Sequence, residues 1–118
     1  MPLRVFDRNR GNIDAARQAL AAAEARRINT VAAATAQARN AIANVEAAQR
    51  RVEALEKAAV PEAAEALRLA QLSYREGRAS LLELLDFQDS YTTARSALTE
   101  ARLALALATA ELGRIAAQ

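Results

Sequence analysis

A long stretch without helix breakers sets the strongest limit on the fold. Between Asn12 and Val60 the sequence contains no proline and no glycine, and alanine is its most frequent residue. Alanine is the best helix former, and the Leu, Arg, Glu and Gln that supply much of the remainder are also favourable. This composition is typical of long helices and coiled coils. The stretch therefore predicts one uninterrupted helix, roughly 70 Å long at 1.5 Å per residue.

The same alanines limit the size of the core. Hydrophobic residues make up 53% of the chain but aromatic residues only 3%. Because alanine buries little apolar area, we expect no thick globular core.

The charge and the residue types present exclude several functions. The 16 basic and 14 acidic residues are interspersed and give a net charge of only +2. With no basic block, we expect no nucleic-acid partner. No run approaches the length of a membrane-spanning helix, and nothing resembles a signal peptide.

Catalysis and cofactor binding have no support in the sequence. The chain contains no His and no Cys, no Gly-rich phosphate loop, and no nucleophile grouped with a base. Glu46, Glu53 and Glu56 have the spacing of ordinary helix-surface charge. We therefore expect no enzyme activity, no cofactor and no metal site.

Two departures from the helical pattern divide the first arm. Residues 1–11 contain Pro2, Phe6 and a polar cluster that ends at Gly11, and they are predicted to be an extended segment and turn. Asn12 would then cap a helix over residues 12–75. Pro61 removes one helical hydrogen bond, so we expect a kink or short break near residues 58–61.

The chain reverses at a single glycine. Gly77 is the only glycine between Gly11 and Gly113, and glycine tolerates the left-handed backbone that ends many helices. Residues 76–78 are thus predicted to be a hairpin tip, followed by a second helix over residues 79–118. Two heptad positions of that helix predict its inner face: Leu84, Tyr91, Leu98, Leu105 and Leu112, and Phe87, Ala94, Ala101, Ala108 and Ile115.

The two arms differ in length. The second helix would reach back only to about Gln37, which leaves apolar residues between Asn12 and Ala36 without a partner. A weak heptad seam on the first helix comprises Ile28, Val31, Thr35, Ala38, Ile42, Val45, Gln49 and Val52. We therefore expect self-association that buries Ile28, Val31, Ile42 and Val45, and we expect the chain to be one domain that is part of a larger protein.

These features predict an all-α fold: a long antiparallel α-helical hairpin, similar to a coiled coil, with the first helix longer and kinked near Pro61. Three stretches also resemble the TolC-type outer-membrane efflux factors. They are Phe6–Ile13 with Ala16; Val60–Leu67, as in the branch that exports cobalt, zinc and cadmium; and Tyr74-x-x-Gly77-x-x-Ser80-x-x-x-Leu84-Leu85-Asp86-x-Gln88. Phe87 and Arg4 depart from the family pattern.

The resemblance implies a passive export conduit, of which this chain would be the second periplasmic helical hairpin. In the family, three protomers form an outer-membrane barrel and a helical tunnel in the periplasm of Gram-negative bacteria. The tips of the tunnel meet a periplasmic adaptor protein, which links them to an inner-membrane pump. The resemblance thus implies export of a substrate, and in this branch the substrates are metal cations.

The resemblance also implies roles for residues at the tip. Tyr74, Gly77, Arg78 and Ser80 correspond to the adaptor-docking tip, and Glu83 and Asp86 correspond to acidic rings at the tunnel entrance. Alternatively, Gly77 only makes the turn, Tyr74 only packs, and the two acids are solvated surface charges. For the whole chain, the alternatives are a stand-alone coiled-coil scaffold or oligomerisation module, and an amphipathic helix protein that lies on lipid.

Overall fold

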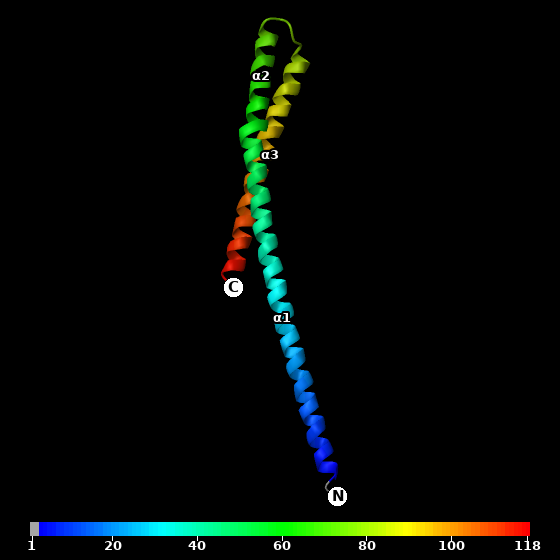
Figure 1. Cartoon of the computed structure of the whole chain (residues 1–118). Helices are drawn as coiled ribbons and strands as arrows, with labels where there is room; N and C mark the ends of the chain where they lie inside the picture. The colour runs from blue at the N-terminus through cyan, green and yellow to red at the C-terminus, as the bar shows by residue number, and fades with distance from the viewer. Residues whose placement is uncertain (1–2) are drawn as a thin grey trace. The chain divides into compact units, whose positions relative to one another are not determined.

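The computed structural model describes residues 3–118, with side chains from Asn9 onward. Every regular element in this range is helical (Figure 1): α1 (Leu3–Ala54), the π-helical turn η1 (Leu55–Ala59), α2 (Val60–Arg75) and α3 (Leu81–Ala116). The all-α prediction is confirmed. By its internal contacts the chain divides into two units, Met1–Arg39 and Asn40–Gln118.

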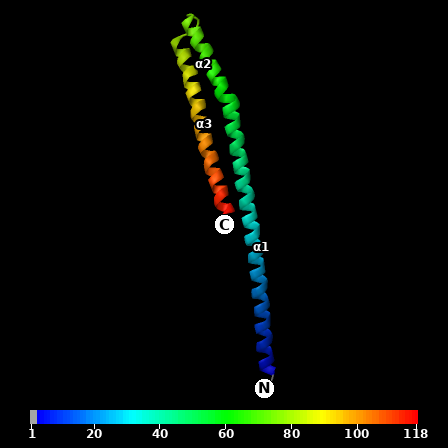
Figure 2. The same cartoon turned by 90° about the vertical axis from the view of Figure 1, so that its left-hand side faces the viewer.

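The second unit is the predicted antiparallel hairpin. After the turn, α3 runs back beside α2, η1 and the end of α1 (Figures 1 and 2). The first of the two heptad positions predicted for its inner face is buried or half-buried in every heptad: Leu84, Tyr91, Leu98, Leu105 and Leu112. The heptad pattern of the second helix is therefore confirmed at this position.

The core of the hairpin is thin. Among the side chains described, the buried hydrophobic residues are Ala41, Ala70, Leu98 and Ala101, and Ala101 is the most enclosed at 2% exposure. Alanines at a helix contact let the two backbones approach closely, but each buries little area. Leu98 is the one large side chain among the four.

The inner face of the first arm differs from the predicted seam. Val45 and Val52 are half-buried as expected, but Ile42 and Gln49 are exposed. The positions facing α3 are instead taken by Ala41, Ala48 and Leu55. The reason is that the leucines of α3 supply most of the bulk, so small residues opposite them allow the arms to meet. Phe87, which was predicted at the second inner position of the last helix, is 43% exposed and lies outside the seam.

Pro61 does not break the helix where a break was predicted. The chain remains helical, with a π turn over Leu55–Ala59 and α2 beginning at Val60. The N–H of Val60 donates to the carbonyl of Leu55, five residues back. Pro61 is the second residue of α2, and because the residues before it are also helical, the preceding turn has to accommodate its ring and its missing N–H. The wider π turn accommodates the proline without an interruption.

The prediction of an extended segment over residues 1–11 is wrong for the residues described. Helix α1 begins at Leu3 and runs through Gly11 and Asn12, while residues 1 and 2 lie outside the described range. Gly11 costs about 1 kcal/mol inside a helix, but the alanine-rich residues from Ala15 onward already form the helix, which only has to extend through Gly11. Asn12 is therefore an interior residue and not a cap.

Three ion pairs of the second unit join residues three or four apart on the same arm. In each pair the basic side chain donates a hydrogen bond that lowers the pKa of the carboxyl: Glu53 with Lys57, Glu65 with Arg68, and Glu111 with Arg114. All six side chains are largely exposed. Such pairs support their own helix only slightly, because water screens them.

Candidate functional site

The end of α2 is closed by a network of backbone hydrogen bonds around Gly77. The N–H of Gly77 donates to the carbonyl of Tyr74 (3.0 Å), and the N–H of Arg78 donates to the carbonyl of Ser73 (2.9 Å). Gly77 has a φ of +73°, the left-handed conformation that this helix-ending motif requires. Gly77 thus makes the predicted reversal.

The start of α3 is closed by a capping box. The Oγ of Ser80 accepts a hydrogen bond from the N–H of Glu83 (3.2 Å), and a carboxylate oxygen of Glu83 accepts one from the N–H of Ser80 (2.9 Å). Each side chain therefore satisfies a backbone N–H that has no partner inside the helix. The helix begins at Leu81 rather than at the predicted Ala79.

The capping box gives Ser80 and Glu83 a structural role that the sequence reasoning missed. The signal was present, since Ser-x-x-Glu is the pattern of a capping box. One carboxylate oxygen of Glu83 is occupied by the box, while Asp86, one turn further on, is exposed. Within residues 9–118 the carboxylate of Asp86 makes no ion pair.

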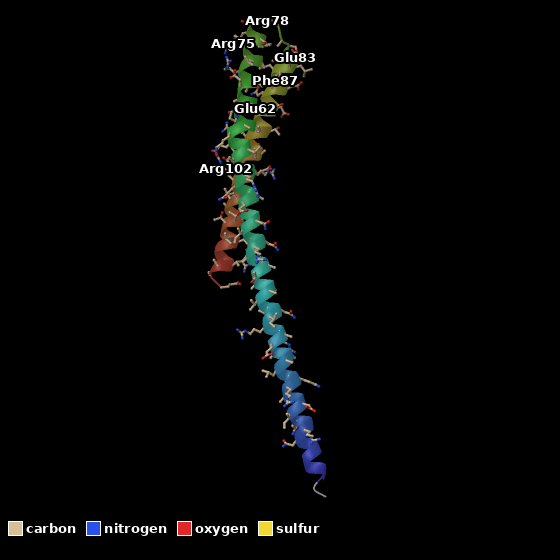
Figure 3. The ribbon with its side chains drawn as sticks, viewed as in Figure 1. Glu62, Arg75, Arg78, Glu83, Phe87 and Arg102 are labelled. Atoms are coloured by element: carbon tan, nitrogen blue, oxygen red, sulfur yellow. The ribbon has the colours of Figure 1, made fainter. Side chains whose placement is uncertain are left out.

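The charged side chains at the tip lie on its surface. Arg78 pairs with Glu76 across the turn, and both remain accessible. Arg75 extends from the outer side of α2 (Figure 3) and is exposed. Tyr74 is 43% exposed, so it does not pack fully against α3. The tip therefore presents arginine and tyrosine side chains to solvent.

Three leucines in the first turns of α3 are also exposed. Leu82 is 70% accessible, the highest value among the large hydrophobic residues left exposed, and Leu81 and Leu85 are about half accessible. We call Leu81, Leu82 and Leu85 the tip leucines. The heptad places only Leu84 of this stretch on the inner face. The other leucines at 81–85 have no place in the seam, and this excess in the sequence indicated an exposed apolar surface.

A shallow groove lies between α2 and α3 next to the tip. Its volume is about 410 Å³, and its lining is mainly small or apolar: Ala66, Leu69, Ala70, Ser73, Ala79, Glu83 and Phe87. Glu83 is its one ionisable group. In the part of the chain that the structure describes, no three His, Cys, Asp or Glu side chains are grouped so as to hold a metal ion.

The geometry defines a class of protein: a helical hairpin that acts through its surfaces, with a hydrogen-bonded tip and exposed apolar side chains beside it. Over residues 1–118 the sequence matches the outer membrane efflux protein family. The chain belongs to this family, as the resemblance of its three stretches implied. It is therefore a component of an outer-membrane efflux channel, in a family of transport channels rather than enzymes.

No curated protein and no solved structure matches the chain. Among residues 3–118, no helix is long and apolar enough to cross a membrane.

Proposed function

We propose that the chain is a periplasmic tunnel hairpin of the channel component of a tripartite efflux pump, the second such hairpin of its protomer. In this role it docks a periplasmic adaptor through its tip and so connects indirectly to an inner-membrane pump. It lines a passive conduit within a homotrimer. The observation that carries the proposal is the cluster of tip leucines, exposed beside a closed turn.

The tip has the properties expected of a docking surface. Solvent-exposed leucines are unfavourable unless a partner covers them, and three lie within two turns of the reversal. Arg75 and Arg78 flank them with groups that can bond to a partner. Because the turn is held by the Gly77 network and the Ser80–Glu83 box, these side chains are held on a defined backbone, and binding has less chain to order.

The flanks of the hairpin fit a tunnel wall. Large apolar side chains are also exposed away from the tip, on α2 at Leu69 and Leu72 and on α3 at Leu103 and Leu107. A helix in a tunnel has a neighbour on each side, so apolar residues outside the hairpin seam would be covered by other helices of the trimer.

Export of metal cations rests on the resemblance of Val60–Leu67 to the metal branch and on acids near the tip. Asp86 is exposed, and Glu83 keeps one carboxylate oxygen outside its capping bond. Repeated around a trimer, such acids would form rings that favour cations. Of the two, Asp86 is the better candidate for a ring, because Glu83 also holds the end of α3.

Docking is tested with a cognate adaptor hairpin titrated against the chain. We expect Leu82→Arg and Arg78→Glu each to raise the dissociation constant at least about tenfold, a loss near 1.4 kcal/mol. Gly77→Trp should also abolish binding, because it adds bulk at the tip and strains the left-handed turn. Neither Leu82 nor Arg78 contributes its side chain to the hydrogen bonds that close the turn, so helicity by circular dichroism should be unchanged in those two variants.

The matched control for Leu82→Arg is Leu103→Arg. Both leucines are exposed on α3, but Leu103 lies far from the tip. The Leu103→Arg variant should therefore bind the adaptor with the affinity of the unaltered chain. If Leu82→Arg and Arg78→Glu bind like the unaltered chain, the tip is not the docking surface. The stand-alone scaffold would then be the better account.

Self-association of the first arm is a separate prediction. Four large apolar side chains of the first unit are exposed: Ile13, Leu20, Ile28 and Val31. Burial of these side chains against a second copy of the chain would favour association. We expect sedimentation to show oligomers at high concentration, and Ile28→Glu with Val31→Glu to weaken them at least about tenfold, since each change puts a charge into an apolar contact. A chain that stays monomeric at every concentration would contradict this.

A further inference from the structure

The two halves of the hairpin are packed with different side chains. Towards its open end, the inner face of the first arm carries Val45, Val52 and Leu55, and the inner face of α3 carries Leu98, Leu105 and Leu112. We call residues 41–55 and 98–115 the base. Towards the turn, the inner face of α2 carries mostly small residues, namely Ala63, Ala66, Ala70 and Ser73, and Leu67 is the one larger half-buried side chain among residues 61–75.

The tip segment, residues 61–94, is consequently the looser half. Alanine and serine make far fewer apolar contacts than valine and leucine, so less free energy holds α2 to α3 there. The groove of about 410 Å³ lies within this segment, between Leu69 and Ala70 on one arm and Phe87 on the other. The side chains of the two arms therefore leave space between them near the turn.

The π turn lies at the boundary between the two halves. In η1 the hydrogen bond from Val60 spans five residues rather than four. Pro61 follows it directly, has no N–H, and cannot donate to the preceding turn. A π turn beside a proline is a common place for a long helix to bend. The first arm thus has its weakest backbone where the packing changes.

One ion pair joins the arms at the same level. Nη2 of Arg102 on α3 donates to Oε1 of Glu56 in η1 at 2.7 Å. Among the side chains described, this is the only hydrogen bond between the two arms, since all the others join residues at most four apart. Figure 3 shows Arg102 well below the tip. The pair fastens the π turn to α3.

We propose that residues 55–61 form a hinge about which α2 separates from α3, and that the Glu56–Arg102 pair is its latch. Helix α3 has no comparable interruption between Leu81 and Ala116, so the first arm absorbs the bend. The tip segment opens and closes on this hinge while the base remains packed. This motion requires neither the adaptor nor the trimer.

The chain contains no cysteine, so spin labels can be placed at chosen positions only. One pair, Gln71→Cys with Asp89→Cys, spans the tip segment, and a second, Arg50→Cys with Ala110→Cys, spans the base. All four positions are exposed. In the chain of residues 1–118 we expect the tip pair to give a broader distance distribution than the base pair.

Two further variants test the hinge and its latch. Arg102→Met removes the latch and should broaden the tip distribution, with amide exchange of residues 60–75 faster by about two- to fivefold, because both side chains of the pair are exposed. Pro61→Ala restores a backbone N–H donor and should narrow the distance distribution of the tip pair. The matched control is Arg114→Met, which removes an exposed arginine of α3 that pairs only within its own helix and should leave the tip distribution unchanged.

The hinge is overturned if the tip pair is as narrow as the base pair. It is also overturned if Pro61→Ala leaves the tip distribution as broad as before. The latch is overturned if Arg102→Met and Arg114→Met have the same effect on the tip pair. Circular dichroism of each variant confirms that the helices are retained, so that a broad distribution reports opening and not unfolding.

Discussion

Replacement of Leu98 by alanine is expected to lower the free energy of unfolding of the hairpin by about 2–3 kcal/mol. Leu98 is 9% exposed and, from Asn9 to Gln118, is the only large side chain among the buried residues, which are otherwise alanines. Its removal deletes a large part of the apolar area that joins the arms, and the neighbouring alanines cannot fill the space. Urea unfolding followed by far-ultraviolet circular dichroism, at one fixed chain concentration, measures the change.

Leu103→Ala is the control for this prediction. Leu103 lies on the same helix, five residues further on, but is 60% exposed. Its truncation should change the free energy of unfolding by less than about 0.5 kcal/mol. Equal losses for the two variants would mean that the chain is not held by the seam that α3 presents to the first arm.

The second large effect is expected at Gly77. Gly77→Val should destabilise the hairpin by about 2 kcal/mol, because a β-branched residue is strained at a φ of +73°. The space around the position is open, so the cost comes from the backbone and not from a clash. Thermal or urea unfolding of the variant reports it.

Gly113→Ala should change the free energy of unfolding in the opposite direction. Gly113 is inside α3, and a methyl group there meets no neighbouring atom. Alanine at this position should stabilise the helix by about 0.5–1 kcal/mol, because glycine loses more backbone freedom when a helix forms. Destabilisation by both glycine substitutions would show that a general sensitivity to change, and not the left-handed turn, explains Gly77.

The fold was predictable because one pattern dominated each arm. The heptad from Leu84 to Leu112 places α3 against its partner, and Gly77 places the reversal. The register of the first arm was not predictable in the same way. Ile42 and Ala41 are both apolar, and the choice of Ala41 as the inner residue depends on how close the facing helix comes, which a pattern within one helix does not contain.

The helical state of residues 3–11 and the π turn show a further limit. Gly11 indicated a turn, yet its cost is local, and the alanine-rich helix that follows it extends through it. Pro61 indicated a disturbance of the helix but not its form, because a kink, a break and a π turn all relieve the same missing donor. The capping box was readable from Ser80 and Glu83 alone.

The first unit of the chain has one consequence for how the molecule responds to heat. From Asn9 to Gln37 every side chain is exposed, so no packing within the chain holds these residues helical. They need not nucleate a helix of their own, since α1 is continuous to Ala54. Their helical order should therefore be lost gradually from the N-terminal end, residue by residue, on warming. The hairpin beyond them, which depends on a shared seam, should melt in a single cooperative step.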